Sequence, residues 1–271
     1  KGYGASLQDA LTRPYPPYEK VGIRNPGGDY NQLSTTLLQI ENEFYGTIRP
    51  KRVIFPGERP LHALRERGVE YVEVRLMDLD PFETVGINAQ TMRFIDVFLL
   101  HCLLSDSPDD TPQEITELKH NQHQTAERGR QPGLTLKRAG REVPLTAWGA
   151  ELVAEFAPIA AALDAVHGGT QYSDTLTAAQ AGLRDASSLP SARVLEAMAK
   201  DYDNSFVQFA RAQSEKIHLE LENLPLSDEQ LVRFTAMTKA SIEAQKQIEA
   251  SDTIPFEMYR QQYVSAEWLG V

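Results

Sequence analysis

The chain has 271 residues, 41% of them hydrophobic and 24% charged, which suits one large globular domain or two small ones. Its 27 basic and 38 acidic residues give a net charge of −11 at neutral pH. An acidic chain lacks the clustered lysine and arginine side chains that nucleic acids and anionic membranes require. The sequence also contains neither a run of about 20 apolar residues, as a membrane span needs, nor a recognisable signal peptide. These features predict a protein that binds no nucleic acid and no membrane.

Cys102 is the only cysteine, so the chain cannot form an internal disulfide. It lies in the mostly apolar run 98–104, and a lone cysteine in such a run is usually a small buried core residue. A chain without disulfides also suits a reducing compartment. We therefore predict a cytoplasmic protein with Cys102 in its core.

Residues 1–85 are expected to be rich in strands and loops, because proline and glycine punctuate the first thirty residues. The segments 35–45 and 69–77 alternate between apolar and polar side chains, which is the period of a half-buried strand. A helical turn or two is expected between them, at 61–67. The two strands would form an antiparallel sheet with one covered face and one polar face. The covered face would carry Leu38, Ile40, Phe44, Val72, Val74 and Leu76.

After Gly86 the pattern becomes helical. Asn88 is a plausible N-cap for a helix extending to about residue 103, which is apolar nearly all round and should be buried. Ser227 and Gln230 form a capping-box pattern at the start of the last predicted helix. Further helices are predicted at 111–129, 145–166, 171–184, 190–201, 203–221 and 227–250. The fold class is therefore α+β, with a strand-rich part at 1–85 and a helical region at 86–271.

The polar face of the second predicted strand carries Glu73 and Arg75, which lie two residues apart and project to the same side. A carboxylate can hold Mg²⁺, and a guanidinium can neutralise charge on a transferring phosphoryl group. The alternative is a surface charge pair that contributes little to stability. The pattern alone leaves both interpretations open.

The polar face of the first predicted strand offers a similar row of side chains. They would line a polar cleft or simply face solvent, and Arg49 just beyond them would reach either a phosphate or a loop carboxylate. His120 and His123 have helical i, i+3 spacing, but no carboxylate or cysteine completes a recognised metal motif, so an exposed pair is expected. No glycine-rich phosphate loop and no nucleophile elbow is present. The row consists of Gln39, Glu41, Glu43 and Tyr45.

Several segments together resemble bacterial glutamate–cysteine ligases, in the same order and over nearly the whole chain. The two most specific are 38–52, which reads LQIENEFYGTIRPKR, and 68–75, which reads GVEYVEVR. Shorter matches follow at Asp78, 80–82, 129–134 (where Gln131 replaces a lysine), 163–169 and 252–256.

The resemblance implies a fold like glutamine synthetase, in which a curved, mostly antiparallel sheet holds ATP, metal and substrates on its concave face. Residues 1–85 would form part of that sheet, and 86–271 would be a helical region of the same catalytic domain. Family chains are longer, and their N-terminal half supplies most metal carboxylates and part of the cysteine pocket. This chain would therefore be the C-terminal half, inactive by itself, with the N-terminal half as its partner.

The resemblance also implies roles for individual residues. Glu73 matches a metal-ligand carboxylate, and Arg75 matches the arginine that contacts the transferred phosphate. Tyr45 matches a tyrosine of the cysteine-substrate pocket, and Arg49 is assigned to nucleotide or phosphate contact. Gln39, Glu41 and Glu43 remain candidates without a fixed role.

The implied reaction joins the γ-carboxyl of L-glutamate to the amine of L-cysteine through a γ-glutamyl phosphate, the first step of glutathione synthesis. ATP would be consumed, with Mg²⁺ or Mn²⁺ as the metal. Two alternatives remain open. One is a related ATP-dependent carboxylate–amine ligase that uses another amine, and the other is a non-catalytic helical interaction module in which Glu73 and Arg75 are dispensable.

Overall fold

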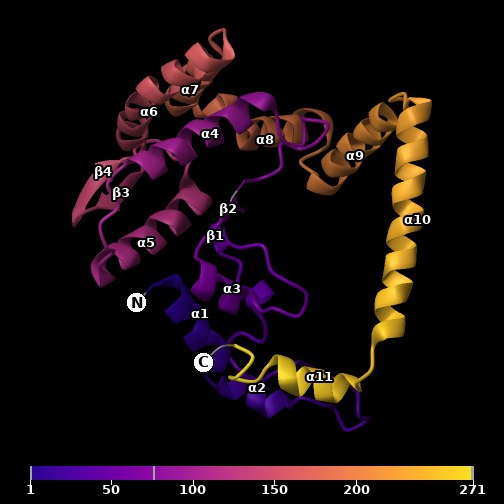
Figure 1. Cartoon of the computed structure of the whole chain (residues 1–271). Helices are drawn as coiled ribbons and strands as arrows, with labels where there is room; N and C mark the ends of the chain where they lie inside the picture. Colours follow the sequence, from indigo (N-terminus) through magenta and orange to yellow (C-terminus); the bar gives the residue numbers. More distant parts are fainter. Residues whose placement is uncertain (1, 76, 270–271) are drawn as a thin grey trace. The chain divides into compact units, whose positions relative to one another are not determined.

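Figure 1 shows the computed structural model, which describes residues 2–75 and 77–269. The chain forms two compact units. The first joins Lys1–Asp78 to Leu226–Val271, and the second is Leu79–Pro225. The structural division therefore falls after Asp78 and again after Pro225, whereas the sequence pattern places a single division after residue 85.

The first unit combines short helices with one small sheet. Its apolar core contains Leu7, Leu11, Leu61 and Leu269, so the end of the chain returns to pack beside the first and third helices. The elements of this unit are α1 (Tyr3–Thr12), α2 (Pro16–Val21), the 3-10 turn η1 (Glu41–Glu43), β1 (Ile48–Lys51), α3 (Pro60–Arg67), β2 (Tyr71–Val74), α10 (Asp228–Ser251) and α11 (Phe256–Tyr263).

Strands β1 and β2 form an antiparallel pair in which Arg49 lies opposite Glu73 and Lys51 lies opposite Tyr71. The pairing continues at both ends, because the Arg75 amide donates to the Thr47 carbonyl and the Glu70 amide donates to the Lys51 carbonyl, each at 2.9 Å. A two-stranded sheet is marginal by itself, so its stability depends on what packs against it.

The predicted strand at 35–45 is wrong. This segment is irregular and ends in η1, and β1 begins only at Ile48. The reason is the burial of Glu41, which alternation places on the polar face but which is only 2% exposed, in contact with Arg59. An extended strand cannot keep its alternating pattern when a polar-face side chain turns into the core.

The second predicted strand exists as β2, shorter than expected, and the helical turns before it are confirmed as α3. The expected burial of its apolar face is wrong for Val72, which is 45% exposed, while Val74 is half-buried. Leu76 lies outside the described residues. This face is partly open, because Ile48 on β1 is exposed as well.

The second unit is mainly helical and contains one β-hairpin. Its elements are α4 (Ala89–Leu104), α5 (Pro112–Arg128), β3 (Thr135–Arg138), β4 (Arg141–Pro144), α6 (Leu145–His167), α7 (Gln171–Arg184), the 3-10 turn η2 (Ala186–Ser188), α8 (Pro190–Asp201) and α9 (Phe206–Glu222). Helices α4, α6 and α7 lie side by side (Figure 1), and their facing side chains form the core. That core consists of Val97, Val153, Phe156, Ala160 and Leu176.

The helical predictions are confirmed within one to three residues. Asn88 caps α4 by accepting a hydrogen bond from the Thr91 amide, and the capping box of α10 is complete. Two expectations for α4 are wrong, because only Val97 is fully buried along it and Cys102 is exposed. In its last turn Leu103 and Leu104 are also exposed, whereas His101 contacts Phe156 of α6.

The sequence predictions contain no counterpart of helices α1, α2 and α11, of strand β1, of the β3–β4 hairpin or of the two 3-10 turns. With them the fold is α+β, built from helices and two small antiparallel sheets, and the predicted class is confirmed. None of the helices in the described part of the chain is both long enough and apolar enough to cross a membrane.

Candidate functional site

The residues with predicted chemical roles gather on the polar face of the β1–β2 sheet. Arg49 and Glu73 are directly opposite one another, and Lys51 and Arg75 follow at two-residue spacing on the same face. This face carries three cationic side chains and one carboxylate. A locally cationic face in a chain of net charge −11 points to binding of an anion.

Glu73 is held between two cations. Its Oε1 accepts a hydrogen bond from Arg75 Nη2 at 2.9 Å, and its Oε2 lies 3.5 Å from Lys51 Nζ. The Arg75 hydrogen bond, with the charges of Arg75 and Lys51, lowers the pKa of Glu73. Glu73 is therefore ionised at neutral pH. Its Oε2 is shielded from solvent and makes no hydrogen bond within the described residues.

Arg49 is the most buried cation of this face, at 6% exposure. Its Nη2 donates to the main-chain carbonyl of Glu41 at 3.0 Å, whereas its Nε has no partner among the described residues. Arg49 also interacts with Tyr3. Burial raises the pKa of the Tyr3 hydroxyl, and the charge and hydrogen bond of Arg49 partly offset that rise. A buried guanidinium with a free donor is costly unless something else binds it.

Tyr45 precedes β1 and is 78% exposed, so its hydroxyl is accessible to a ligand. The Arg75 guanidinium carbon lies 5.7 Å from the centre of its ring, within the range of a cation–π contact. Tyr45, Arg75 and Glu73 thus form a continuous set of contacts, and their roles stay predictions.

Gln39, Glu41 and Glu43 do not join this face. Gln39 Oε1 accepts from the Leu33 amide, and Glu43 accepts from the Gln39 amide, each at 2.6 Å. Glu41 binds Arg59 through both carboxylate oxygens. These three polar side chains therefore hold the segment before β1 in place.

Sequence reasoning gave Lys51 no role of its own, although it lies in the 38–52 segment. The signal was present, because Lys51 is two residues beyond Arg49 and strand periodicity places both on one face. Without the register of β1 against β2, however, nothing in the sequence connects Lys51 with Glu73, which is 22 positions further along the chain.

As a metal site the face fits only in part. Glu73 Oε2 is a suitable oxygen donor, and Mg²⁺ typically takes one or two protein carboxylates with several waters. No group of three or more His, Cys, Asp or Glu side chains within 2–75 and 77–269 is arranged to hold a metal ion. The described residues therefore supply one carboxylate ligand, and His120 and His123 are an exposed pair, as predicted.

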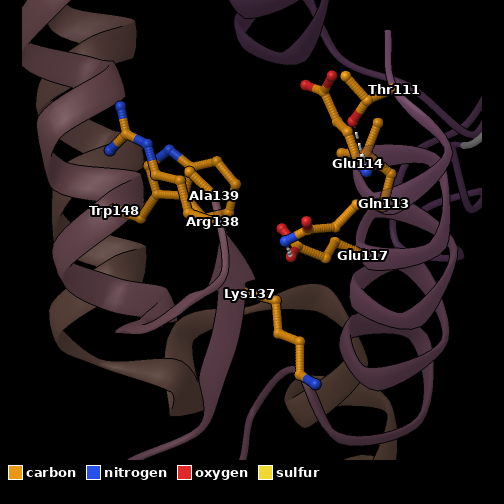
Figure 2. A pocket seen from close by; sticks show the side chains of 9 residues that line it. Thr111, Gln113, Glu114, Glu117, Lys137, Arg138, Ala139 and Trp148 are labelled. Carbon is orange, nitrogen blue, oxygen red and sulfur yellow. Dashed lines mark hydrogen bonds between the residues drawn. The ribbon is translucent and has the colours of Figure 1, made fainter.

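A separate cavity of about 510 Å³ lies in the second unit, between α5 and the β3–β4 hairpin (Figure 2). Two of its charged side chains, Glu117 and Arg138, are already bound within the unit. Glu117 accepts hydrogen bonds from Gln113 Nε2 at 2.8 Å and the Gly140 amide at 3.0 Å, and Arg138 pairs with Glu151 at 2.8 Å. None of the predicted site residues lines this cavity, so the sheet face is the stronger candidate.

The motif at 163–169 has a structural explanation. Asp164, near the end of α6, accepts hydrogen bonds from the Tyr172 and Ser173 amides at 2.8 and 3.0 Å. It thereby caps the first turn of α7 from the preceding helix. Gly168 and Gly169 both have positive φ angles, of 79° and 85°, which close the turn between these helices.

Comparison with known proteins finds similarity to glutamate–cysteine ligases. Residues 1–125 match the family model described as glutamate–cysteine ligase. The glutamate–cysteine ligase of Pseudomonas fluorescens (strain Pf0-1) is 42% identical over 257 residues, covering 95% of this chain and 48% of the relative. That of Janthinobacterium sp. (strain Marseille) is 44% identical over 263 residues, covering 97% of this chain and 49% of the relative.

Comparison of the fold with solved structures finds similarity to the same family. The crystal structure of the glutamate–cysteine ligase of Francisella tularensis in complex with AMP superimposes with a TM-score of 0.90 at 32% identity, covering 98% of this chain and 52% of that chain. The resemblance to bacterial glutamate–cysteine ligases is thus confirmed along nearly the whole sequence. The chain spans about half the length of the curated relatives it matches.

Proposed function

We propose that this chain forms part of an ATP-dependent ligase that joins the γ-carboxyl of L-glutamate to the amine of L-cysteine, the first step of glutathione synthesis. The observation that carries the proposal is the set of charges on one face of β1–β2, where Arg49, Lys51 and Arg75 surround Glu73. The similarity to glutamate–cysteine ligases over 95% of the chain supports it. Both compact units would belong to one catalytic domain.

In this reaction the γ-carboxylate oxygen of glutamate attacks the terminal phosphorus of ATP, and ADP leaves. The cysteine amine then attacks the acyl carbon of γ-glutamyl phosphate, the amine loses a proton, and inorganic phosphate departs. Arg75 would bind the transferred phosphoryl oxygens, and Arg49 would contact nucleotide or phosphate through its free donor. Tyr45 would bind the cysteine carboxylate. The protein thus acts by positioning reactants and stabilising charge.

Glu73 would hold Mg²⁺ or Mn²⁺ through its unbonded Oε2. The metal, when bound, neutralises charge on the phosphates. Because the described residues offer one carboxylate there, the remaining ligands would come from the N-terminal half of the full-length protein. We expect this chain alone to release no ADP at ordinary enzyme rates, above about 1 per second.

The open face of the small sheet also supports a missing partner segment. Ile48 and Val72 are exposed, at 40% and 45%, on the side of β1–β2 opposite the charges. Apolar side chains on a marginal two-stranded sheet favour a covering element. We assign that cover to the N-terminal half. The use of ATP and reduced cysteine as substrates supports a cytoplasmic location for the reaction.

Arg75→Lys in the full-length protein tests the proposal. Lysine keeps the charge but lacks the planar fork of donors, so kcat for ADP release should fall about 10²- to 10³-fold while the melting temperature stays unchanged. The matched control is Arg138→Lys, because Arg138 also pairs with a carboxylate, Glu151, at 2.8 Å and contacts an aromatic ring, Trp148, at 5.1 Å. A kcat within a few-fold of wild type for both variants would leave Glu73–Arg75 as a surface charge pair.

The same assay separates the alternatives. A related ligase would release ADP with glutamate and another amine in preference to cysteine. A non-catalytic helical module would bind no nucleotide and would tolerate loss of both Glu73 and Arg75.

A further inference from the structure

We propose that Lys51 is a second phosphate-binding cation of the β1–β2 face and acts together with Arg75 on the same phosphoryl group. The inference rests on the proposed ATP-dependent reaction at this face, to which it adds a residue that neither the motifs nor the matches single out.

The first observation is geometric. Lys51 Nζ lies 3.5 Å from Glu73 Oε2, while Arg75 Nη2 lies 2.9 Å from Glu73 Oε1. Two cations that reach the two oxygens of one carboxylate are close enough together to bind two oxygens of one phosphate. Glu73 therefore lies between the two cations, Lys51 and Arg75. A phosphate from solvent would bind at this same position, either beside Glu73 or in its place.

The second observation concerns charge. With Arg49, the face holds three cations and a single carboxylate, so Glu73 neutralises only one of them. A phosphoryl group carries more than one negative charge and offers three oxygens, which suits a pair of cations better than a substrate carboxylate does. Lys51 is 29% exposed and Arg75 is 36% exposed, so both remain accessible to a ligand from solvent.

The third observation is that the Lys51–Glu73 contact is loose. At 3.5 Å it is an ion pair, and Glu73 Oε2 makes no hydrogen bond in the described part of the chain. An ammonium group on a flexible stem can turn from such a contact toward a phosphate oxygen at little cost. Lys51 competes with a metal ion for Glu73 and attracts phosphate. Its removal should therefore strengthen metal binding and weaken phosphate binding.

The experiment measures binding to the full-length protein of three probes, ATP and adenosine by calorimetry without divalent metal, and Mn²⁺ alone by water proton relaxation. Lys51→Met should weaken ATP binding about 10- to 100-fold, as expected for loss of a hydrogen bond to a charged group, and leave adenosine binding unchanged. It should also lower the Kd for Mn²⁺ by at least about twofold, because a competing positive charge is gone. Lys51→Arg should retain ATP binding.

The control is Lys137→Met, which removes an exposed strand lysine from β3 in the second unit and should change none of the three affinities. If Lys51→Met binds ATP as wild type does, the Lys51 assignment is overturned while the proposed ligase function stands. Equal weakening of ATP and adenosine would indicate a structural role and would also overturn it. If the wild-type full-length protein binds no ATP at all, both the proposed function and the Lys51 assignment are overturned.

Discussion

The two units bury different kinds of side chain. The second unit is held by an apolar helix interface, and its buried polar residues bond mainly to main-chain groups, as Asn121 does with Lys137 at 2.7 and 2.8 Å. The first unit buries two complete guanidinium groups, those of Arg49 and Arg59, at 6% and 1% exposure. In the second unit the buried carboxylate of Asp164 is stabilised by the amides of Tyr172 and Ser173, whereas a face that binds anions needs its arginines fixed in place.

Arg59 shows how the first unit accommodates buried charge. It binds Glu41 through two donors, donates to the Tyr263 carbonyl, and stacks 4.0 Å from the centre of the Tyr263 ring. One ion pair thus ties the turn before β1 to the last helix of the chain. The main-chain carbonyl of the same Glu41 holds Arg49, so the pair also supports the candidate site.

Arg59→Leu should cause the largest loss in the free energy of unfolding among the variants that test this difference between the units. It leaves the Glu41 carboxylate buried without its cation, and breaking a buried pair in this way typically costs about 3–5 kcal/mol. The chain has one tryptophan in each unit, Trp148 and Trp268, so urea unfolding of the first unit can be followed by Trp268 fluorescence in a Trp148→Phe background. The double variant with Glu41→Leu should recover part of the loss. A cost below about 1 kcal/mol for the single variant would contradict the role assigned to the pair.

Leu176→Ala is the corresponding change in the second unit. It opens a cavity among Val97, Val153 and Phe156, and truncating a buried leucine costs about 2–5 kcal/mol without leaving any charge behind. The loss should be reported by Trp148 fluorescence in a Trp268→Phe background. Leu195→Ala on α8, where the side chain is 50% exposed, is the matched control and should change stability by about 0.5 kcal/mol or less. Equal losses for both variants would mean that the α4–α6–α7 interface is not the core.

Glu58 provides the smallest test, near the surface of the first unit. Both of its oxygens bind Arg67, at 2.6 and 2.7 Å, and with the Phe55 amide this lowers the pKa of Glu58 to about 2. Because the folded-state pKa lies below the unfolded one, the contribution is fully present above about pH 4.3 and is lost as the pH falls toward 2. The Glu58→Gln variant should therefore have a lower melting temperature than wild type at pH 7. This difference in melting temperature should disappear between about pH 4 and pH 2. A gap that does not vary with pH would show that the carboxylate charge is irrelevant.

The sequence was sufficient for structure that depends on near neighbours. Helices α4 to α9 begin and end close to where periodicity and caps predict, because a cap such as that of Asn88 with Thr91 joins residues only three apart. The pairing of Glu73 with Arg75 was predictable for the same reason, since strand residues two apart share a face.

Only the tertiary structure decided the contacts between distant segments. Alternation places Glu41 on a polar face, yet Arg59, 18 positions away, draws it into the core. Strand register brings Lys51 to Glu73, and packing returns Leu269 to the first helix. Local patterns report the period and ends of single elements, whereas burial of charge and cross-strand pairing depend on which segments meet when the chain closes on itself. For that reason the sequence alone determined helices α4 to α10 and the family resemblance, and the fold decided which charged side chains share the candidate site.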